Sequence, residues 1–249
     1  MDTAAYFARI RWHGPVSISA ANLAAMHRAH MFAVPFENLD IHRGRPISLD
    51  LEALFDKIVT RSRGGFCYEL NGLFCALLLE LGYRVTMLSS EVAGEGGRFS
   101  PPFDHLALQV DLDEPWLADV GFGDGFRRPL RLNDPGPQEQ DGSTYRIAME
   151  GANHVLYRRD GSDDWTPQYW FTLEPRRLSD FAERCRFHQT SPGSHFTRNR
   201  ICTLARPDGR ITLSGLRLIE SSPAGKTERT LLDEAEYAAV LNREFAMIE

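Results

Sequence analysis

The chain has 249 residues, of which 43% are hydrophobic and 25% are charged, and its formal net charge is −6 at pH 7. This composition is ordinary for a globular protein. The negative charge excludes a general attraction to nucleic acid or to an anionic membrane surface, because both need a basic face. No run approaches the ~18 apolar residues that span a bilayer, and a helical pattern over 2–10 stands in place of a signal peptide, so we expect a cytoplasmic protein.

Helical patterns dominate the first third of the chain. We expect a helix over 2–10, a second from a cap at Ser19 to about Met31, and a third that begins at a cap on Ser48 or Asp50. The next apolar stripe has helical spacing and stops at Gly82; its members are Leu70, Leu73, Phe74, Leu77, Leu78 and Leu81. Cys67 directly precedes this stripe and follows two glycines, so we place it in or just before the first turn of the helix.

From about residue 85 the pattern becomes that of strands. His105 opens an alternating run that places Leu106, Leu108, Val110 and Leu112 on the opposite face. A turn over 113–115 and a second strand over 116–120 should return antiparallel and bring Asp119 opposite position 107. His105 and Asp119 then share a face within side-chain reach. This prediction depends on an even register, because a slip of one residue would separate them.

The last part of the chain mixes both patterns. We expect a loop over 133–137, a strand near 145–149, a helix from Ser179 to about His188, a hairpin that turns at 207–209 and a final helix over 233–245. The four cysteines at 67, 75, 185 and 202 form no CxxC pair, which predicts reduced thiols and neither a zinc site nor a disulfide framework. We assign Cys75, Cys185 and Cys202 to packing.

The placement of Cys67 predicts a nucleophile. The unpaired N–H groups and the dipole of a helix start favour an anion, so we expect the pKa of the thiol to lie below its usual value of about 8.5. Gly64 and Gly65 would allow a positive φ and a close approach to substrate. Taken alone, Cys67 fits a buried packing cysteine equally well. With His105 and Asp119 it gives a nucleophile, a base and a carboxylate that orients the base.

Several segments together resemble the arylamine N-acetyltransferase family. The family's nucleophile motif is matched by RGGFCYELN at 63–71, its histidine motif by DHLAL at 104–108 and its aspartate motif by WLADVGFGD at 116–124. PFENL at 35–39 and SPGSHF at 191–196 resemble further family landmarks, so the likeness covers most of the chain. The resemblance implies a catalytic triad of Cys67, His105 and Asp119.

The resemblance also implies an α+β fold in three parts. We expect an N-terminal helical bundle over 1–84 that carries the nucleophile and a central β-barrel over 85–178 that carries the histidine and the aspartate. A third, lid-like α/β portion would occupy 179–249. The first two parts would share a cysteine-protease-like core.

The activity implied by the resemblance is ping-pong transfer of an acetyl group from acetyl-coenzyme A, through an acyl-cysteine, to an arylamine, a hydrazine or an N-hydroxyarylamine, without a metal. Backbone N–H groups near Cys67 and in the loop 121–125 would stabilise the oxyanion. Gly123, Arg127 and Arg128 are candidates for coenzyme contacts; the alternative for the two arginines is a solvated pair at a loop end.

Other residues match family positions less specifically. Phe36, Phe122 and Phe196 would wall the site of the acceptor amine, with core packing as the competing interpretation. Glu37 and Arg63 resemble a charge-assisted pair that fixes the nucleophile turn. His188 and His195 lack a usual metal spacing, and we assign them to the surface or to packing.

Two alternatives remain open. The chain stops at Glu249, just after its final helix, and this shorter tail resembles the amide synthases of ansamycin biosynthesis, which close a macrolactam with the same triad. A wide cleft open to bulky amines and longer acyl groups would follow. A cysteine protease or transglutaminase also uses Cys, His and Asp in this order, but the glycine loop and the PFENL segment speak against it.

Overall fold

The computed structural model describes residues 1–247, and its N-terminal part is helical. The helices are α1 (Thr3–Arg9), α2 (Ala20–Ala33), α3 (Leu39–His42), α4 (Leu51–Phe55), a π-helical turn η1 (Asp56–Thr60) and α5 (Cys67–Glu80). Asp2, Ser19 and Asp50 cap α1, α2 and α4 by accepting backbone N–H groups. Helix α5 ends where Gly82 takes a φ of 89°, so the predicted stop is confirmed.

The middle of the chain forms a barrel-like antiparallel sheet in the order β5-β4-β3-β2-β9-β8-β7-β6. Its strands are β2 (Arg84–Val92), β3 (His105–Asp111), β4 (Pro115–Ala118), β5 (Leu130–Arg131), β6 (Gln138–Gln140), β7 (Ser143–Glu150), β8 (Asn153–Asp160) and β9 (Thr166–Phe171), with a short 3₁₀ turn η2 (Glu95–Gly97) after β2. Leu108 pairs with Ala118, which continues to Asp119 opposite Ala107. The predicted even register is therefore confirmed.

The C-terminal part combines helices with a second antiparallel sheet. Its elements are η3 (Leu178–Phe181), α6 (Ala182–Thr190), α7 (His195–Arg198), β10 (Ile201–Arg206), β11 (Gly209–Ser214), β12 (Arg217–Ser222), β13 (Gly225–Thr230) and α8 (Glu234–Phe245). The predicted hairpin at 207–209 and the two predicted helices, which are α6 and α8, are confirmed. Strands β12 and β13 were not predicted. Every residue of β13 is exposed, and most of β12 is exposed too, so neither strand shows an apolar alternation.

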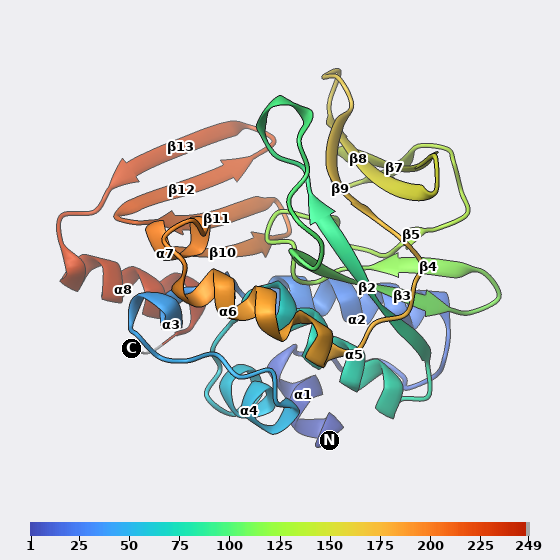
Figure 1. Ribbon diagram of the computed structural model, residues 1–249. Coiled ribbons are helices and arrows are strands. Elements are labelled where there is room, and N and C mark those ends of the chain that lie inside the picture. Colours follow the sequence, from blue (N-terminus) through green and yellow to red (C-terminus); the bar gives the residue numbers. More distant parts are fainter. Residues whose placement is uncertain (248–249) are drawn as a thin grey trace.

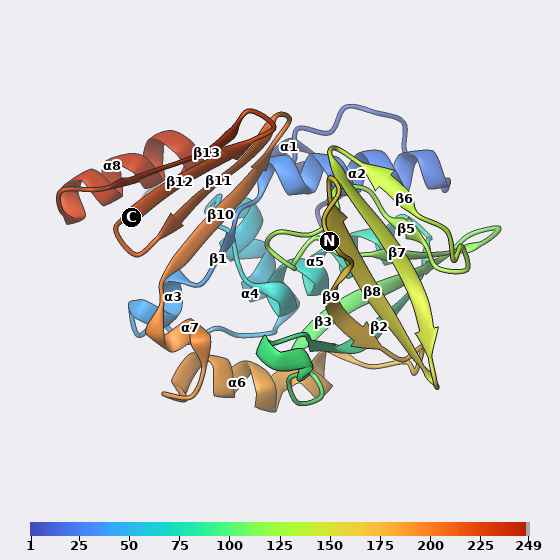
Figure 2. The same cartoon turned by 90° about the horizontal axis from the view of Figure 1, so that it is seen from above.

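The three parts share their sheets and cores (Figure 1). Strand β1 (Phe36–Glu37), from the N-terminal part, is the edge strand of the C-terminal sheet and pairs with β10. Helix α5 packs against β3, and Leu106, Leu108 and Val110 join its apolar stripe in one core. Figure 2, seen from above, shows α5 between the barrel-like sheet and the C-terminal sheet. The α+β prediction is confirmed, while the domain boundaries and the cysteine-protease-like core stay predictions.

Two further findings concern the residues 1–247. All four cysteines are free and buried, which agrees with the assignment of Cys75, Cys185 and Cys202 to packing. None of the described helices combines the length and the apolar character that a membrane span requires.

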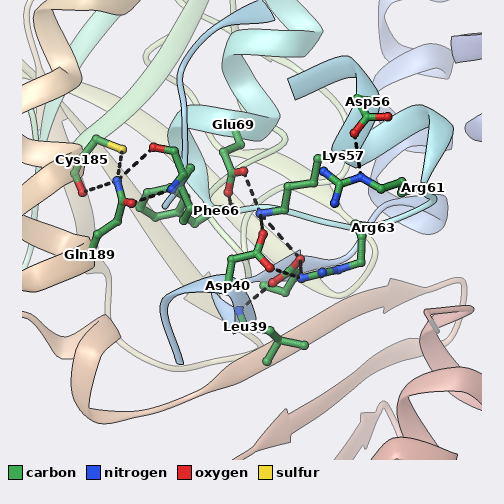
Figure 3. Close-up of polar contacts among 12 residues, drawn as sticks. Leu39, Asp40, Asp56, Lys57, Arg61, Arg63, Phe66, Glu69, Cys185 and Gln189 are labelled. Carbon is green, nitrogen blue, oxygen red and sulfur yellow. Dashed lines mark hydrogen bonds and ion pairs between the residues drawn. The ribbon is translucent and has the colours of Figure 1, made fainter. Parts of the chain in front are cut away.

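A buried cluster of charged side chains lies beneath the turn that leads into α5 (Figure 3). The Lys57 ammonium lies 2.8 Å from Glu69 and 2.9 Å from Asp40. The Arg63 guanidinium lies 2.7 Å from Glu37 and 3.1 Å from Asp40, so the predicted Glu37–Arg63 pair is confirmed. Burial lowers the pKa of Lys57, but the surrounding carboxylates outweigh it and raise that pKa above the usual range. Lys57 is therefore charged.

The cluster is connected to the start of α5. The second carboxylate oxygen of Glu69 accepts the backbone N–H of Phe66 at 3.0 Å. Phe66 is the N-cap residue of α5, so Glu69 satisfies one of the N–H groups that a helix start leaves without a partner. Lys57 thus holds the carboxylate that shapes the turn before Cys67.

We expect Lys57→Met to lower the free energy of unfolding by about 3–5 kcal/mol, because it leaves the carboxylate of Glu69 buried without its cation, while Asp40 keeps its pair with Arg63. Arg61→Met is the matched control. Arg61 follows the same π-helical turn and pairs with Asp56 at 2.8 Å, but both side chains are about half exposed, so its loss should cost below about 1 kcal/mol. Urea unfolding of both variants measures the difference, and equal losses would contradict a structural role for the buried cluster.

Candidate active site

Cys67 is the first residue of α5 and is buried, 4% exposed. The turn before it runs beside β1, where the N–H of Glu37 donates to the carbonyl of Gly65 at 2.9 Å. Neither Gly64 nor Gly65 has a positive φ, so that part of the prediction was wrong. A Cβ on Gly64 would lie 2.1 Å from the carbonyl oxygen of Pro35. The glycine is needed for close contact with the protein's own backbone.

The predicted low pKa of Cys67 was also wrong. Burial raises the pKa of the Cys67 thiol well above its usual value, and the charges of Asp104 and Asp119 raise it further. A hydrogen bond with the backbone of Leu106 acts in the opposite direction. The reason lies in the magnitudes: a helix start contributes about 0.3–1 kcal/mol, below one pKa unit, whereas full burial shifts a pKa by up to about 3–5 units. A helix start alone therefore cannot ionise this thiol.

His105 and Asp119 meet as the strand register requires. Nε2 of His105 lies 2.7 Å from Oδ2 of Asp119, and both side chains are buried. A carboxylate only accepts hydrogen bonds, so Nε2 carries the proton and Nδ1 is left with its lone pair. Burial raises the pKa of Asp119, but His105 and the other donors outweigh it and hold that pKa below its usual value.

Three further groups hold the Asp119 carboxylate. Oδ1 accepts from the amide of Asn71 at 2.8 Å and from the N–H of Gly121 at 2.9 Å, and Oδ2 accepts from the hydroxyl of Tyr169 at 3.0 Å. Asn71 lies one helical turn after Cys67 on α5, so the same helix carries the thiol and a ligand of the carboxylate. The N–H of Gly121 is already donated, and this contradicts its expected part in the oxyanion site.

The loop after Asp119 lies against the backbone of Cys67. A Cβ on Gly121 would be 2.8 Å from Cα of Cys67 and 2.9 Å from its carbonyl oxygen. Real Cβ atoms do not approach so closely, so any side chain at 121 would separate the loop from α5. The glycine brings the aspartate loop and the thiol to van der Waals distance.

A cavity of about 590 Å³ opens beside the thiol. Cys67 and His105 line it together with the three predicted aromatic residues, Phe36, Phe122 and Phe196. Phe36 and Phe196 contact each other with ring centroids 6.1 Å apart, and Phe122 packs edge-on against the His105 ring at 5.2 Å. The structure thus brings these five residues to one apolar cavity with a thiol and an imidazole at its wall.

The three residues predicted for coenzyme contacts do not line this cavity, and their contacts with the coenzyme stay a prediction. Gly123 takes a φ of 86° and packs on the Phe36 ring, where a Cβ would lie 3.5 Å away. Arg127 donates to the carbonyls of Pro207 and Gly209, at 3.3 and 2.5 Å, and lines a separate cavity of about 440 Å³. Arg128 reaches the carbonyl of Glu139 at 3.4 Å. The Arg127 guanidinium therefore links the barrel-like sheet to the C-terminal sheet.

His188 packs among aromatic rings, as one of its two expected assignments has it, and it also lines the cavity, which the sequence analysis did not predict. It is buried, lines the cavity of Cys67, and places Nε2 2.9 Å from Asp104 and Nδ1 3.1 Å from the Ser194 hydroxyl. Burial raises the pKa of Asp104, but His188 and then Arg184 outweigh it and lower that pKa to about 2. The spacing of Arg184 and His188, four residues apart on α6, was the available signal. His195 is exposed and also lines the cavity.

Within the described part of the chain, no group of three His, Cys, Asp or Glu side chains is arranged to hold a metal ion. The site thus consists of a buried thiol, an imidazole with a free lone pair and a carboxylate held by four donors. These groups suit transfer of an acyl group through sulfur.

Comparison with known proteins identifies the family. A family model described as N-acetyltransferase matches residues 19–248. The arylamine N-acetyltransferase of Escherichia coli strain K12 is 35% identical over an alignment of 246 positions that covers 97% of this chain and 87% of that protein. The arylamine N-acetyltransferase of Mycolicibacterium smegmatis is 36% identical over an alignment of 252 positions that covers 98% of this chain and 91% of that protein.

Solved structures agree. The Mycobacterium marinum arylamine N-acetyltransferase in complex with CoA superimposes with a TM-score of 0.92 at 34% identity, covering 99% of this chain and 93% of that one. The Salmonella typhimurium enzyme superimposes with a TM-score of 0.93 at 32% identity, covering 98% and 90%. The chain therefore belongs to the arylamine N-acetyltransferase family of acyltransferases.

Proposed function

We propose that the chain transfers an acetyl group from acetyl-coenzyme A to an arylamine, a hydrazine or an N-hydroxyarylamine, with Cys67 as the acyl carrier and His105 and Asp119 as base and orienting carboxylate. The observation that carries the assignment is the His105–Asp119 contact of 2.7 Å, which leaves Nδ1 unprotonated beside the cavity that Cys67 lines. The family membership supplies the donor and the acceptor class.

In the first half-reaction His105 Nδ1 takes the thiol proton while the Cys67 sulfur attacks the thioester carbonyl of acetyl-coenzyme A. Burial disfavours a lone thiolate, so thiolate and imidazolium form together, with Asp119 stabilising the imidazolium. The tetrahedral oxyanion faces the first turn of α5, where the N–H of Cys67 has no acceptor within the helix. Collapse of the intermediate breaks the bond to the coenzyme sulfur, which leaves with the proton from His105.

In the second half-reaction the acceptor amine attacks the acetyl-cysteine carbonyl and gives its proton to His105. Cleavage of the bond to sulfur then releases the amide and restores Cys67. Phe36, Phe122 and Phe196 form the wall against which the aromatic ring packs, because stacked and edge-on aromatic contacts favour an aryl group over an alkyl one. The cytoplasmic location predicted from the sequence stays a prediction.

The assignment of the acyl carrier has a direct test. Wild-type protein incubated with acetyl-coenzyme A without an amine should gain the mass of one acetyl group on the peptide that contains Cys67. Cys67→Ser should gain none and lose transfer altogether, because the serine hydroxyl stays protonated beside the same base. Cys75→Ser is the matched control, since Cys75 is a buried cysteine two turns further along α5. Acetylation that persists in Cys67→Ser would exclude Cys67 as the carrier.

Asp119→Asn tests the orienting carboxylate. We expect acylation to slow by about 10⁴-fold, as for other triads that lose this charge. The pH at which Cys67 reacts with iodoacetamide should rise, because a neutral amide stabilises imidazolium poorly. Asp111→Asn, at the far end of β3, should leave both readouts unchanged. An Asp119→Asn profile that overlays the wild type would show that the charge of Asp119 plays no part.

The cavity volume of about 590 Å³ predicts tolerance of longer acyl groups. One extra methylene in a hydrophobic pocket changes a transition-state free energy by about 1–3 kcal/mol at most. We expect kcat/KM to fall less than about 100-fold from acetyl to propionyl thioester with one arylamine. A steeper fall in kcat/KM would indicate a tight acetyl pocket. Hydrolysis of peptides in place of acyl transfer would favour the cysteine protease alternative.

A further inference from the structure

His27, on α2, is fully buried between two aromatic rings next to the loop that carries Asp119. Its imidazole stacks on Phe126, with centroids 5.6 Å apart and planes 14° from parallel, and meets the Phe74 ring edge-on at 6.0 Å. Nε2 lies 3.1 Å from the backbone nitrogen of Asp119, and Nδ1 lies 3.0 Å from the carbonyl oxygen of Arg127. One side chain therefore contacts both ends of the loop 119–127.

The two partners determine the protonation of His27. A backbone N–H can only donate, so Nε2 must hold the lone pair, and a backbone carbonyl can only accept, so Nδ1 must carry the proton. The imidazole is therefore neutral, in a single tautomer, with both nitrogens satisfied. Burial lowers the pKa of His27 to about 4, although its hydrogen bonds and the Asp119 charge act against this. The contact with Asp119 thus persists through the neutral pH range.

We propose that His27 is a positioning residue for the transfer reaction, which clamps the two ends of the loop 119–127 and so sets the backbone from which Asp119 reaches His105. This inference rests on the proposed function of Cys67, His105 and Asp119. The loop has little freedom once its ends are fixed, because Gly121 within it lies against Cys67. A shift of the Asp119 backbone would move the carboxylate away from Nε2 of His105.

His30 provides a matched comparison. It lies on the same helix, is equally buried, and packs edge-on against the same Phe74 ring, at 5.6 Å. Its Nδ1 contacts the Tyr6 hydroxyl at 2.9 Å, on α1 and away from the loop 119–127. Loss of either imidazole removes a buried ring from the same core. Only the loss of His27 removes a contact with the Asp119 backbone.

The test compares four variants, three with a substitution at His27 and one with a substitution at His30. His27→Leu removes both contacts, and His30→Leu is its packing control. His27→Gln can put an acceptor oxygen near the position of Nε2, whereas His27→Asn can put a donor only near Nδ1. Each is assayed for its Tm, for its rate of acetylation of Cys67 by acetyl-coenzyme A well below the lowest Tm, and for the pH profile of Cys67 alkylation.

We expect both leucine variants to lower the Tm. Only His27→Leu should slow acetylation, by at least about tenfold, since a misplacement near 1 Å costs up to about 100-fold, and move the alkylation profile to higher pH. His27→Gln should regain most of the rate, and His27→Asn should not. The proposal is overturned if His27→Leu matches His30→Leu in rate and profile, or if asparagine rescues as well as glutamine. The same assay measures acetylation of Cys67 in the wild-type protein. If the wild type is not acetylated, the proposed function itself fails, and this outcome is distinct from a failure of the proposal for His27.

Discussion

The buried carboxylate of Asp119 is the constraint on which the site depends. A buried charge needs donors, and this one has four: His105, Asn71, the N–H of Gly121 and Tyr169. These donors come from β3, α5, the loop itself and β9, so satisfying one carboxylate joins the nucleophile helix to the barrel-like sheet. The same bonds leave the His105 ring with one possible orientation. The packing of the core thus also fixes the contact between His105 and Asp119.

The ionisation of Cys67 follows from this arrangement. Burial opposes a thiolate more strongly than the helix start favours one, and so it raises the pKa of the Cys67 thiol. In the proposed mechanism the thiol proton moves to His105, and the Asp119 carboxylate stabilises the imidazolium that this forms.

Residues whose position follows from the pattern of their own segment could be predicted from the sequence. Residues whose partners lie far away in the chain could not. The alternation around His105 predicted the register that places Asp119, because side chains in a strand repeat every two residues. Tyr169 reaches Asp119 across 50 positions and His27 across 92, and nothing near either residue indicates such a partner. The prediction of a low pKa for Cys67 was wrong for the same reason, because elements distant in the chain bury the thiol. The family resemblance named Phe36, Phe122 and Phe196, which periodicity alone would assign to the core.

Two networks of buried polar groups hold α5 from different sides. Glu69, in the first turn, joins the cluster around Lys57, and Asn71 joins Asp119 while its amide also donates to the Leu106 carbonyl at 2.6 Å. Between them runs the apolar stripe that packs on β3. Apolar packing alone tolerates small slides of a helix along its groove, whereas hydrogen bonds of fixed length do not. Because the bonds of Glu69 and Asn71 hold opposite sides of the helix, they fix its depth and rotation and with them the position of the Cys67 sulfur.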